Sequence, residues 1–271
     1  MNMRGLTVTA VACLTIAGVT GCNDKSADHA DKGADSKPSA TASSDSGEPE
    51  APAGGKKNGM AKLPPQKILD KAEAALKGAP SLRAVMDSGP QKLDMAMDNK
   101  KNCRGTQMKD GIEQELIQRD DVLYMKTSDA FWEAKFKDKA PEIEKLVGDR
   151  YVKTSPSDLQ MSGGFICGTH FFDVLLFSEM GFKGKPVTKG HPTKIDGVRT
   201  IPLKGTIDDE QMTLSVALTG KPYPLRIAGT EKGKSMLMNF TDYGKPVPDD
   251  VPAPEDTVDA QEIRKLTGDI Q

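Results

Sequence analysis

Few residues of this chain could do chemistry, and most of them lie near Cys167. Cys167 and His170 have the C-x-x-H spacing of some metal sites, and Asp173 follows His170 by three residues, which favours a polar contact within one helix. One other cysteine, Cys103, lies beyond the N-terminal region. In a protein that leaves the cytoplasm, two such thiols normally oxidise. The sequence therefore favours a disulfide between Cys103 and Cys167, with a metal site at Cys167 and His170 as the alternative.

The remaining polar residues do not form a recognisable catalytic site. The sequence contains no G-x-S-x-G, H-E-x-x-H, P-loop or G-x-G-x-x-G motif, and His170 and His191 are its histidines beyond the N-terminal region. The acidic groups Asp208–Glu210 and Asp249–Asp250 could touch calcium, but neither has EF-hand spacing, and solvated turns are the better interpretation. We therefore expect a protein that is not an enzyme and that uses no cofactor and no metal.

The first 22 residues predict where the protein works. One cation, Arg4, precedes an apolar run over residues 6–19 that is too short to span a bilayer. The residues Val19-Thr20-Gly21-Cys22 resemble the lipobox of bacterial lipoproteins, which implies that residues 1–21 are a cleaved signal peptide and that Cys22 is lipidated, for example with palmitate. An ordinary signal peptide with an incidental cysteine is the alternative. We expect a lipid-anchored protein on the outer, extracytoplasmic face of the cytoplasmic membrane.

The chain after the signal peptide divides into a tether and a body. Residues 22–59 have no aromatic or large aliphatic side chain, so we expect a disordered tether with a root-mean-square span of roughly 35 Å. Residues 60–271 are long enough for one domain with a sizeable core. The net charge of -2 becomes -3 when Arg4 is removed, and no basic run is present. Nucleic acid is therefore not an expected partner.

The periodicity of apolar residues predicts a helix, then a sheet interrupted by further helices. Apolar residues recur at helical spacing over residues 68–76, and from Leu93 the period changes to two. The expected strands are 93–97, 103–109, 112–119, 121–126, 198–204, 212–218, 223–229 and 236–240. A short helix is expected over Pro141–Leu146 and a longer, mostly apolar one over Phe165–Met180, while residues 258–266 could form a strand or a helix. This order predicts an α+β fold, a strongly curved antiparallel sheet whose helices cover its concave face.

Methionine is concentrated in the expected sheet. Ten of the 13 methionines lie between Met86 and Met238, and two pairs at alternating positions put four thioethers on one face of their strands. Such flexible side chains suit a surface that adapts to variable apolar ligands, although taken alone they are better explained as filling an irregular core. A 16-carbon acyl chain that leaves water gains roughly 13 kcal/mol, so a groove that holds one needs no catalytic group.

Short pieces of the body, in order and spacing, resemble the actinobacterial LolA-like lipoproteins of the LppX/LprG type. The pieces are Ala79-Pro80-Ser81, Cys103-Arg104-Gly105-Thr106, Val122–Lys126 with Trp132, Tyr151-Val152-Lys153, Asp196-Gly197-Val198, Gly220–Ile227 and Phe240–Gly244. The resemblance covers residues 67–253, nearly the whole body. It implies an antiparallel half-barrel whose helices cover a hydrophobic cavity for the acyl chains of a lipid or glycolipid.

By this resemblance the apolar faces of the strands and of the covering helix form the lipid site. The residues we nominate from their alternation are Leu93, Met95, Met97, Met125, Phe171, Leu175, Leu214, Val216, Met236 and Met238. The implied function is that of a carrier or chaperone in cell-envelope lipid trafficking, working with an envelope transport partner that the sequence does not identify. The alternative is an envelope-stress sensor or protein-interaction module with the same fold. A continuous apolar pocket would favour the carrier, and an exposed apolar patch on the helices would favour the module.

Overall fold

The computed structural model describes residues 55–158, 167–179, 181–231 and 233–268. The predicted signal peptide, Cys22 and most of the predicted tether lie outside these ranges, as do Phe165, Ile166 and Met180 of the predicted long helix. In the described ranges no helix is long and apolar enough to cross a membrane.

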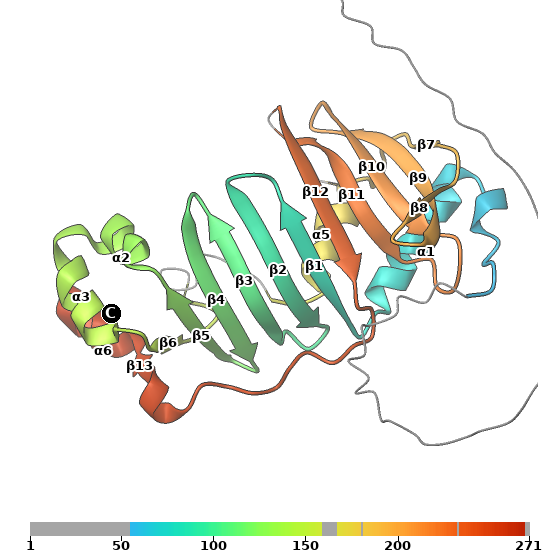
Figure 1. The fold of residues 1–271 in the computed structure, drawn as a ribbon. Helices are drawn as coiled ribbons and strands as arrows, with labels where there is room; N and C mark the ends of the chain where they lie inside the picture. Colours follow the sequence, from blue (N-terminus) through green and yellow to red (C-terminus); the bar gives the residue numbers. More distant parts are fainter. Residues whose placement is uncertain (1–54, 159–166, 180, 232, 269–271) are drawn as a thin grey trace, which may run out of the picture. The chain divides into compact units, whose positions relative to one another are not determined.

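A curved, unclosed sheet of thirteen strands forms the described body (Figure 1). The strands follow the order β13-β6-β5-β4-β3-β2-β1-β12-β11-β10-β9-β7, and β8 also pairs with β9. All pairs are antiparallel except β13 with β6. The strands are β1 Ser81–Asp87, β2 Gln91–Asp98, β3 Cys103–Lys109, β4 Ile112–Arg119, β5 Val122–Thr127, β6 Tyr151–Thr154, β7 Thr188–Lys189, β8 Thr193–Ile195, β9 Val198–Ile207, β10 Glu210–Ala217, β11 Pro224–Glu231, β12 Lys234–Thr241 and β13 Thr257–Asp259.

The helices form two groups in this body (Figure 1). The first is α1 (Pro65–Lys77) with α5 (His170–Phe177), and the second is α2 (Asp129–Phe136), α3 (Ala140–Val147) and α6 (Ala260–Thr267), which lie beside β6 and β13. Short 3-10 helices occupy Met60–Lys62, Lys137–Lys139 and Pro254–Asp256. The buried side chains of both groups join one core cluster with the sheet.

The helix α5 packs on what we call the inner face of the sheet, the face that carries Phe240, Met95 and Met125. The ring of Phe172 on α5 lies 5.1 Å from the ring of Phe240 on β12, in an edge-to-face arrangement. Strand pairing places Ala84 opposite both Phe240 and Met95. Because directly opposed residues project from the same face of a sheet, these side chains form one apolar row beneath α5.

The long apolar helix expected over Phe165–Met180 is shorter within the described residues. It begins at His170, because Cys167 is held in a disulfide and Gly168 has φ 122°. It ends at Phe177, where the backbone N–H of Phe182 returns to the carbonyl of Leu176 at 2.8 Å and satisfies an acceptor of the last turn. The apolar residues of this segment thus cover one part of the inner face with a two-turn helix.

The residues between β12 and β13 cross the opposite, outer face of the sheet. Ser81 Oγ donates to the carbonyl of Lys245 at 2.5 Å, Arg119 Nη2 donates to that of Val247 at 3.1 Å, and Arg104 pairs with the carboxylate of Asp250. Alternation along β3 and β4 puts Arg104 and Arg119 on the face opposite to the inner face. This proline-rich connection therefore packs along the back of the sheet and leaves the inner face to the helices.

Tyr151 on β6 lies beside this connection, and we expect it to ionise late. Burial, followed by its hydrogen bond with Glu115, raises the pKa of Tyr151 to about 12. Since the folded pKa lies above the ordinary value of 10, the contribution to stability is present below pH 10 and is lost as the pH rises through 12. Burial also raises the pKa of Tyr243 well above 10, so ultraviolet titration of tyrosinate should show two late-titrating tyrosines. Tyr151→Phe should remove one of them, and Glu115→Gln should move one of them to lower pH. An unchanged number of late-titrating tyrosines in Tyr151→Phe would contradict this assignment.

Candidate functional site

The strand residues nominated from the sequence all lie on the inner face. Met95 opposes Gly105, Gly105 opposes Leu116, and Leu116 opposes Met125, so one row runs from β2 to β5. On the other side, register and alternation through β12, β11 and β10 place the remaining nominees on the same face. The buried nominees are Leu93, Met95, Met97, Met125, Leu214, Val216 and Met238.

The other three nominees are more accessible. Met236 on β12 and Phe171 on α5 are partly buried and pack against the core cluster. Leu175 on α5 is 39% exposed. The structure therefore places the nominated strand residues on the face against which α5 packs at Phe240, and it leaves one side of this helix accessible. Their role in lipid binding stays a prediction.

A cavity of about 960 Å³ opens at the N-terminal end of α5. This volume is at the upper end of the range of ligand pockets, about 300–1,000 Å³. Phe171 is the nominee that lines it. The lining residues are Asp98, Asn99, Lys101, Gln118, Asp121, Ser155, Pro156, Ser157, Cys167, Gly168, Thr169, His170, Phe171 and Val174. The cavity thus has an apolar side on α5 and polar loops around it.

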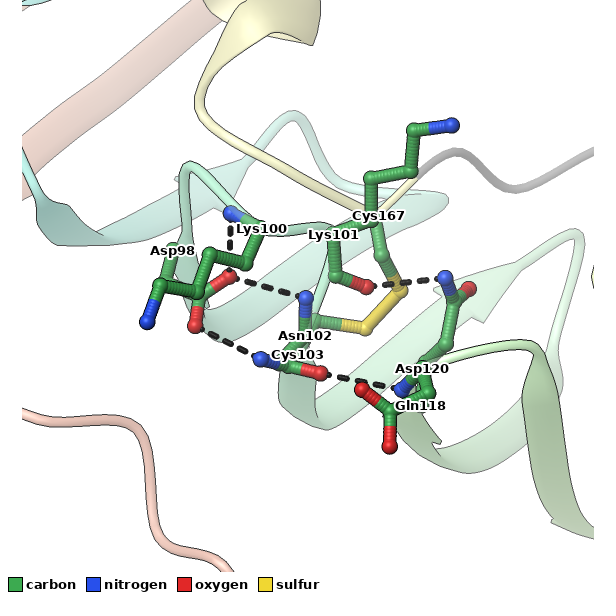
Figure 2. The surroundings of a disulfide bond; sticks show 8 residues. All are labelled: Asp98, Lys100, Lys101, Asn102, Cys103, Gln118, Asp120 and Cys167. Atoms are coloured by element: carbon green, nitrogen blue, oxygen red, sulfur yellow. Dashed lines mark hydrogen bonds between the residues drawn. A yellow bond between two sulfur atoms is a disulfide. The ribbon is translucent and has the colours of Figure 1, made fainter.

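A disulfide fixes one wall of this cavity. Cys103, the first residue of β3, is bonded to Cys167, whose Cα lies 5.5 Å from that of Cys103 (Figure 2). The bond is the pairing that the sequence favours over a metal site at Cys167 and His170, and a sulfur held in it offers no free thiolate. Among the described residues, no group of three or more His, Cys, Asp and Glu side chains could hold a metal ion.

A hydrogen-bond network holds the loop next to this disulfide (Figure 2). Asp98 Oδ1 accepts from the backbone N–H groups of Lys100 and Asn102 at 2.8 and 2.9 Å, and its Oδ2 accepts from Asn102 Nδ2 at 2.8 Å. Gln118 Nε2 on β4 donates to the carbonyl of Lys101 at 2.8 Å. The polar wall of the cavity is therefore fixed by its own hydrogen bonds.

The Asp173 carboxylate links α5 to α1. Asp173 is 8% exposed, and its carboxylate lies 3.7 Å from Lys77 Nζ on α1 and 3.7 Å from His170 Nδ1. The hydrogen bond of Lys77 with Glu73 raises the pKa of the Lys77 ammonium. Both distances to Asp173 exceed a hydrogen bond, and the His170 side chain is 84% exposed. The geometry fits the polar contact within α5 that the i to i+3 spacing of His170 and Asp173 predicts, with Lys77 of α1 beside the same carboxylate.

The polar residues of the cavity escape sequence analysis. Asp98, Lys101, Ser155 and Ser157 lie at strand ends and in loops, where hydrophobic periodicity gives no signal. Gln118 lies in a predicted strand, and its alternation with Leu116 is the one pattern that could have placed it on the inner face.

Neither a protein-family model nor a curated protein matches the sequence. The fold, however, is similar to solved structures. LprF from Mycobacterium bovis is 17% identical, with 70% of this chain and 97% of that chain covered and a TM-score of 0.50. The Mycobacterium tuberculosis lipoprotein LppX is 15% identical, with 69% and 98% covered and a TM-score of 0.46. A LolA superfamily protein from Nitrosomonas europaea is 12% identical, with 69% and 96% covered and a TM-score of 0.25.

The likeness to LprF concerns the fold, and it agrees with the resemblance found in the sequence. The described body is an unclosed, mostly antiparallel curved sheet with a few helices, which matches the fold of the neighbours. The described body of this chain has a fold similar to that of LprF.

Proposed function

We propose that this protein is a membrane-anchored extracytoplasmic lipoprotein that holds the acyl chains of a lipid or glycolipid between its sheet and α5. The observation that carries the proposal is the inner face itself, whose apolar rows lead to a cavity of about 960 Å³ beside α5. The polar loops around this cavity would face the headgroup, and the apolar rows would take the chains. A role as carrier or chaperone in envelope lipid trafficking follows from such a site.

Burial of hydrocarbon supplies enough free energy for this function. About 0.8 kcal/mol per CH₂ gives roughly 13 kcal/mol for a 16-carbon chain. The rows on the inner face are filled by side chains in this structure, since Met95, Met97 and Met125 are fully buried. Acyl chains would therefore enter by displacing flexible methionines and moving α5. Movement of α5 would weaken the contact between Asp173 on α5 and Lys77 on α1.

A protein-interaction module is the second candidate, and one observation favours it. Leu175 is 39% exposed on α5, next to the partly buried Phe171 and Val174. If this protein is an envelope-stress sensor, the apolar side of α5 could bind a partner protein. A protein that never carries lipid would support this second function.

Lipid that accompanies the purified protein tests the first function. The full-length protein would be produced in an actinobacterial host, and organic extracts would be analysed by mass spectrometry alongside a similarly anchored unrelated lipoprotein. We expect non-covalently bound acyl lipid at near one equivalent, enriched over that control. Bare protein that stays free of lipid after incubation with a membrane extract would contradict the carrier function.

Filling the cavity should remove this lipid. Val174 lies on α5, lines the cavity and is partly buried, so Val174→Trp adds volume where we expect the ligand to enter. We expect at least a tenfold loss of bound lipid while the far-ultraviolet circular dichroism stays unchanged. Leu237→Trp is the matched control, because Leu237 on β12 is 37% exposed and alternates with the inner-face residues Met236 and Met238. Equal loss of lipid in Val174→Trp and Leu237→Trp would contradict the proposal that the ligand enters at the cavity beside α5.

A further inference from the structure

Gln114 on β4 is a buried polar side chain on an apolar face. It is 6% exposed, and strand pairing places it opposite Gln107, which in turn opposes the buried Leu93 of β2. Two residues further along β4, Leu116 lies in the row of Met95 and Met125. Burial of a polar group is unfavourable unless the group is hydrogen-bonded. An amide at this position would therefore bring no advantage to a face that bound only hydrocarbon.

The hydrogen bonds of Gln114 satisfy its oxygen better than its nitrogen. Gln107 Nε2 donates to Gln114 Oε1 at 2.7 Å, which fixes the orientation of the Gln114 amide. Gln114 Nε2 in turn donates to the sulfur of Met125 at 3.1 Å. A thioether sulfur is a weak hydrogen-bond acceptor. A stronger acceptor, such as an oxygen, would therefore replace the Met125 sulfur as the partner of the Gln114 N–H group.

We propose that Gln114, oriented by Gln107, donates a hydrogen bond to an oxygen on the acyl chain of the ligand. The inference rests on the proposed function and names a class of ligand for it. Met125 is unbranched and flexible, so its sulfur can move aside when the ligand oxygen takes its place. Gln114 is then a specificity-determining residue that distinguishes an oxygenated chain from a plain one.

The position of Gln114 sets where along the chain this oxygen lies. Gln118 lines the cavity and lies on the same strand and the same face, four residues from Gln114. At about 3.4 Å per residue the two positions are roughly 14 Å apart along the strand. An extended chain advances about 3.5 Å for every three bonds, so the oxygen lies about a dozen bonds from the polar end held at the cavity. The ligand class is a long acyl chain with a hydroxyl or keto oxygen near its middle.

Matched fatty acids test this inference. The full-length chain with Cys22→Ser, which removes the predicted lipidation, would be stripped of lipid and titrated with octadecanoate, 12-hydroxyoctadecanoate and 2-hydroxyoctadecanoate, with displacement of a fluorescent fatty acid as the readout. We expect the 12-hydroxy acid to bind about tenfold more tightly than octadecanoate, equivalent to about 1.4 kcal/mol. The 2-hydroxy acid should show no such advantage, because its oxygen stays at the cavity.

Variants separate the amide from the rest of the groove. Gln114→Leu should bind octadecanoate at least as well as the parent chain and lose the preference for the 12-hydroxy acid. Gln211→Leu, a change at an exposed glutamine on β10, is the matched control and should keep the preference. Equal affinity of the parent chain for both acids, or a preference that survives in Gln114→Leu, would overturn the inference while lipid binding stands. Failure to bind any of the three acids would instead overturn the proposed function and this inference with it.

Discussion

Replacing both Cys103 and Cys167 with serine is expected to lower the free energy of unfolding by about 4 kcal/mol. The disulfide joins residues 64 positions apart, and the chain-entropy relation gives about this value for a loop of that length. The loop contains β4, β5, β6, α2 and α3, so its closure restricts much of the unfolded chain. Urea unfolding followed by circular dichroism would measure the loss, and a double variant within about 1 kcal/mol of the parent would contradict it.

Reductant supplies the control for this prediction. The parent protein in reductant should unfold like the double variant, whereas the double variant should be insensitive to reductant. The effect should also be local, because Cys167 directly precedes Gly168 and Thr169, which line the cavity before α5. In the double variant we expect the backbone amides of α5 to exchange hydrogen faster, while those of β3 and β4 stay protected by their ladder.

The sheet was predictable where local alternation and turn chemistry agree. The strands expected over 103–109 and 112–119 are β3 and β4 with the same bounds, since Asp110 and Gly111 between them adopt φ 54° and 83°, as a tight hairpin requires. The residues expected to form a strand or a helix over 258–266 contain a short strand and then a helix, β13 and α6.

Elements that depend on distant partners were not predictable from local pattern. The strand β1 forms a hairpin with the adjacent β2, but its other edge pairs with β12, where Arg83 opposes Thr241 far along the chain, and this second pairing leaves no local sequence signal. The helix α2 has buried aromatic residues at the adjacent positions 131 and 132, which is not the repeat of an amphipathic helix. The helix α2 is stabilised instead by packing against α3 at the edge of the sheet.

The candidate site divides in the same way. Alternation placed the nominated strand residues on one face, strand register keeps them there, and α5 packs against this face at Phe240. The cavity itself is formed by loops such as the one at Lys101, which only the pairing of β2 with β3 and the disulfide bring to α5. Physical pattern thus predicts the apolar wall of the site, while its polar loops depend on tertiary contacts.

Substitution of Gly105 by alanine is expected to be as damaging as loss of the disulfide. Gly105 lies in the middle of β3, between Met95 and Leu116, and has φ 157°. A Cβ at this position would lie 2.0 Å from the carbonyl oxygen of Asp94 and 2.8 Å from the Cα of Met95. These are backbone atoms of the neighbouring strand β2, so no side-chain rotation can relieve the contact. We expect a loss of roughly 3–5 kcal/mol of unfolding free energy from combined strain and overpacking.

Gly111→Ala separates the effect of this contact from the effect of backbone conformation. Gly111 follows the same strand, has φ 83°, and has no heavy atom within 4 Å of the place that a methyl group would occupy, so alanine there meets conformational strain alone. That strain costs about 1–2 kcal/mol. In parallel urea titrations Gly105→Ala should lose clearly more stability than Gly111→Ala, and equal losses would contradict the close approach of β2 and β3. Because Gly105 also lies in the apolar row between Met95 and Met125, a strand forced apart there would disturb the inner face on which the proposed lipid site depends.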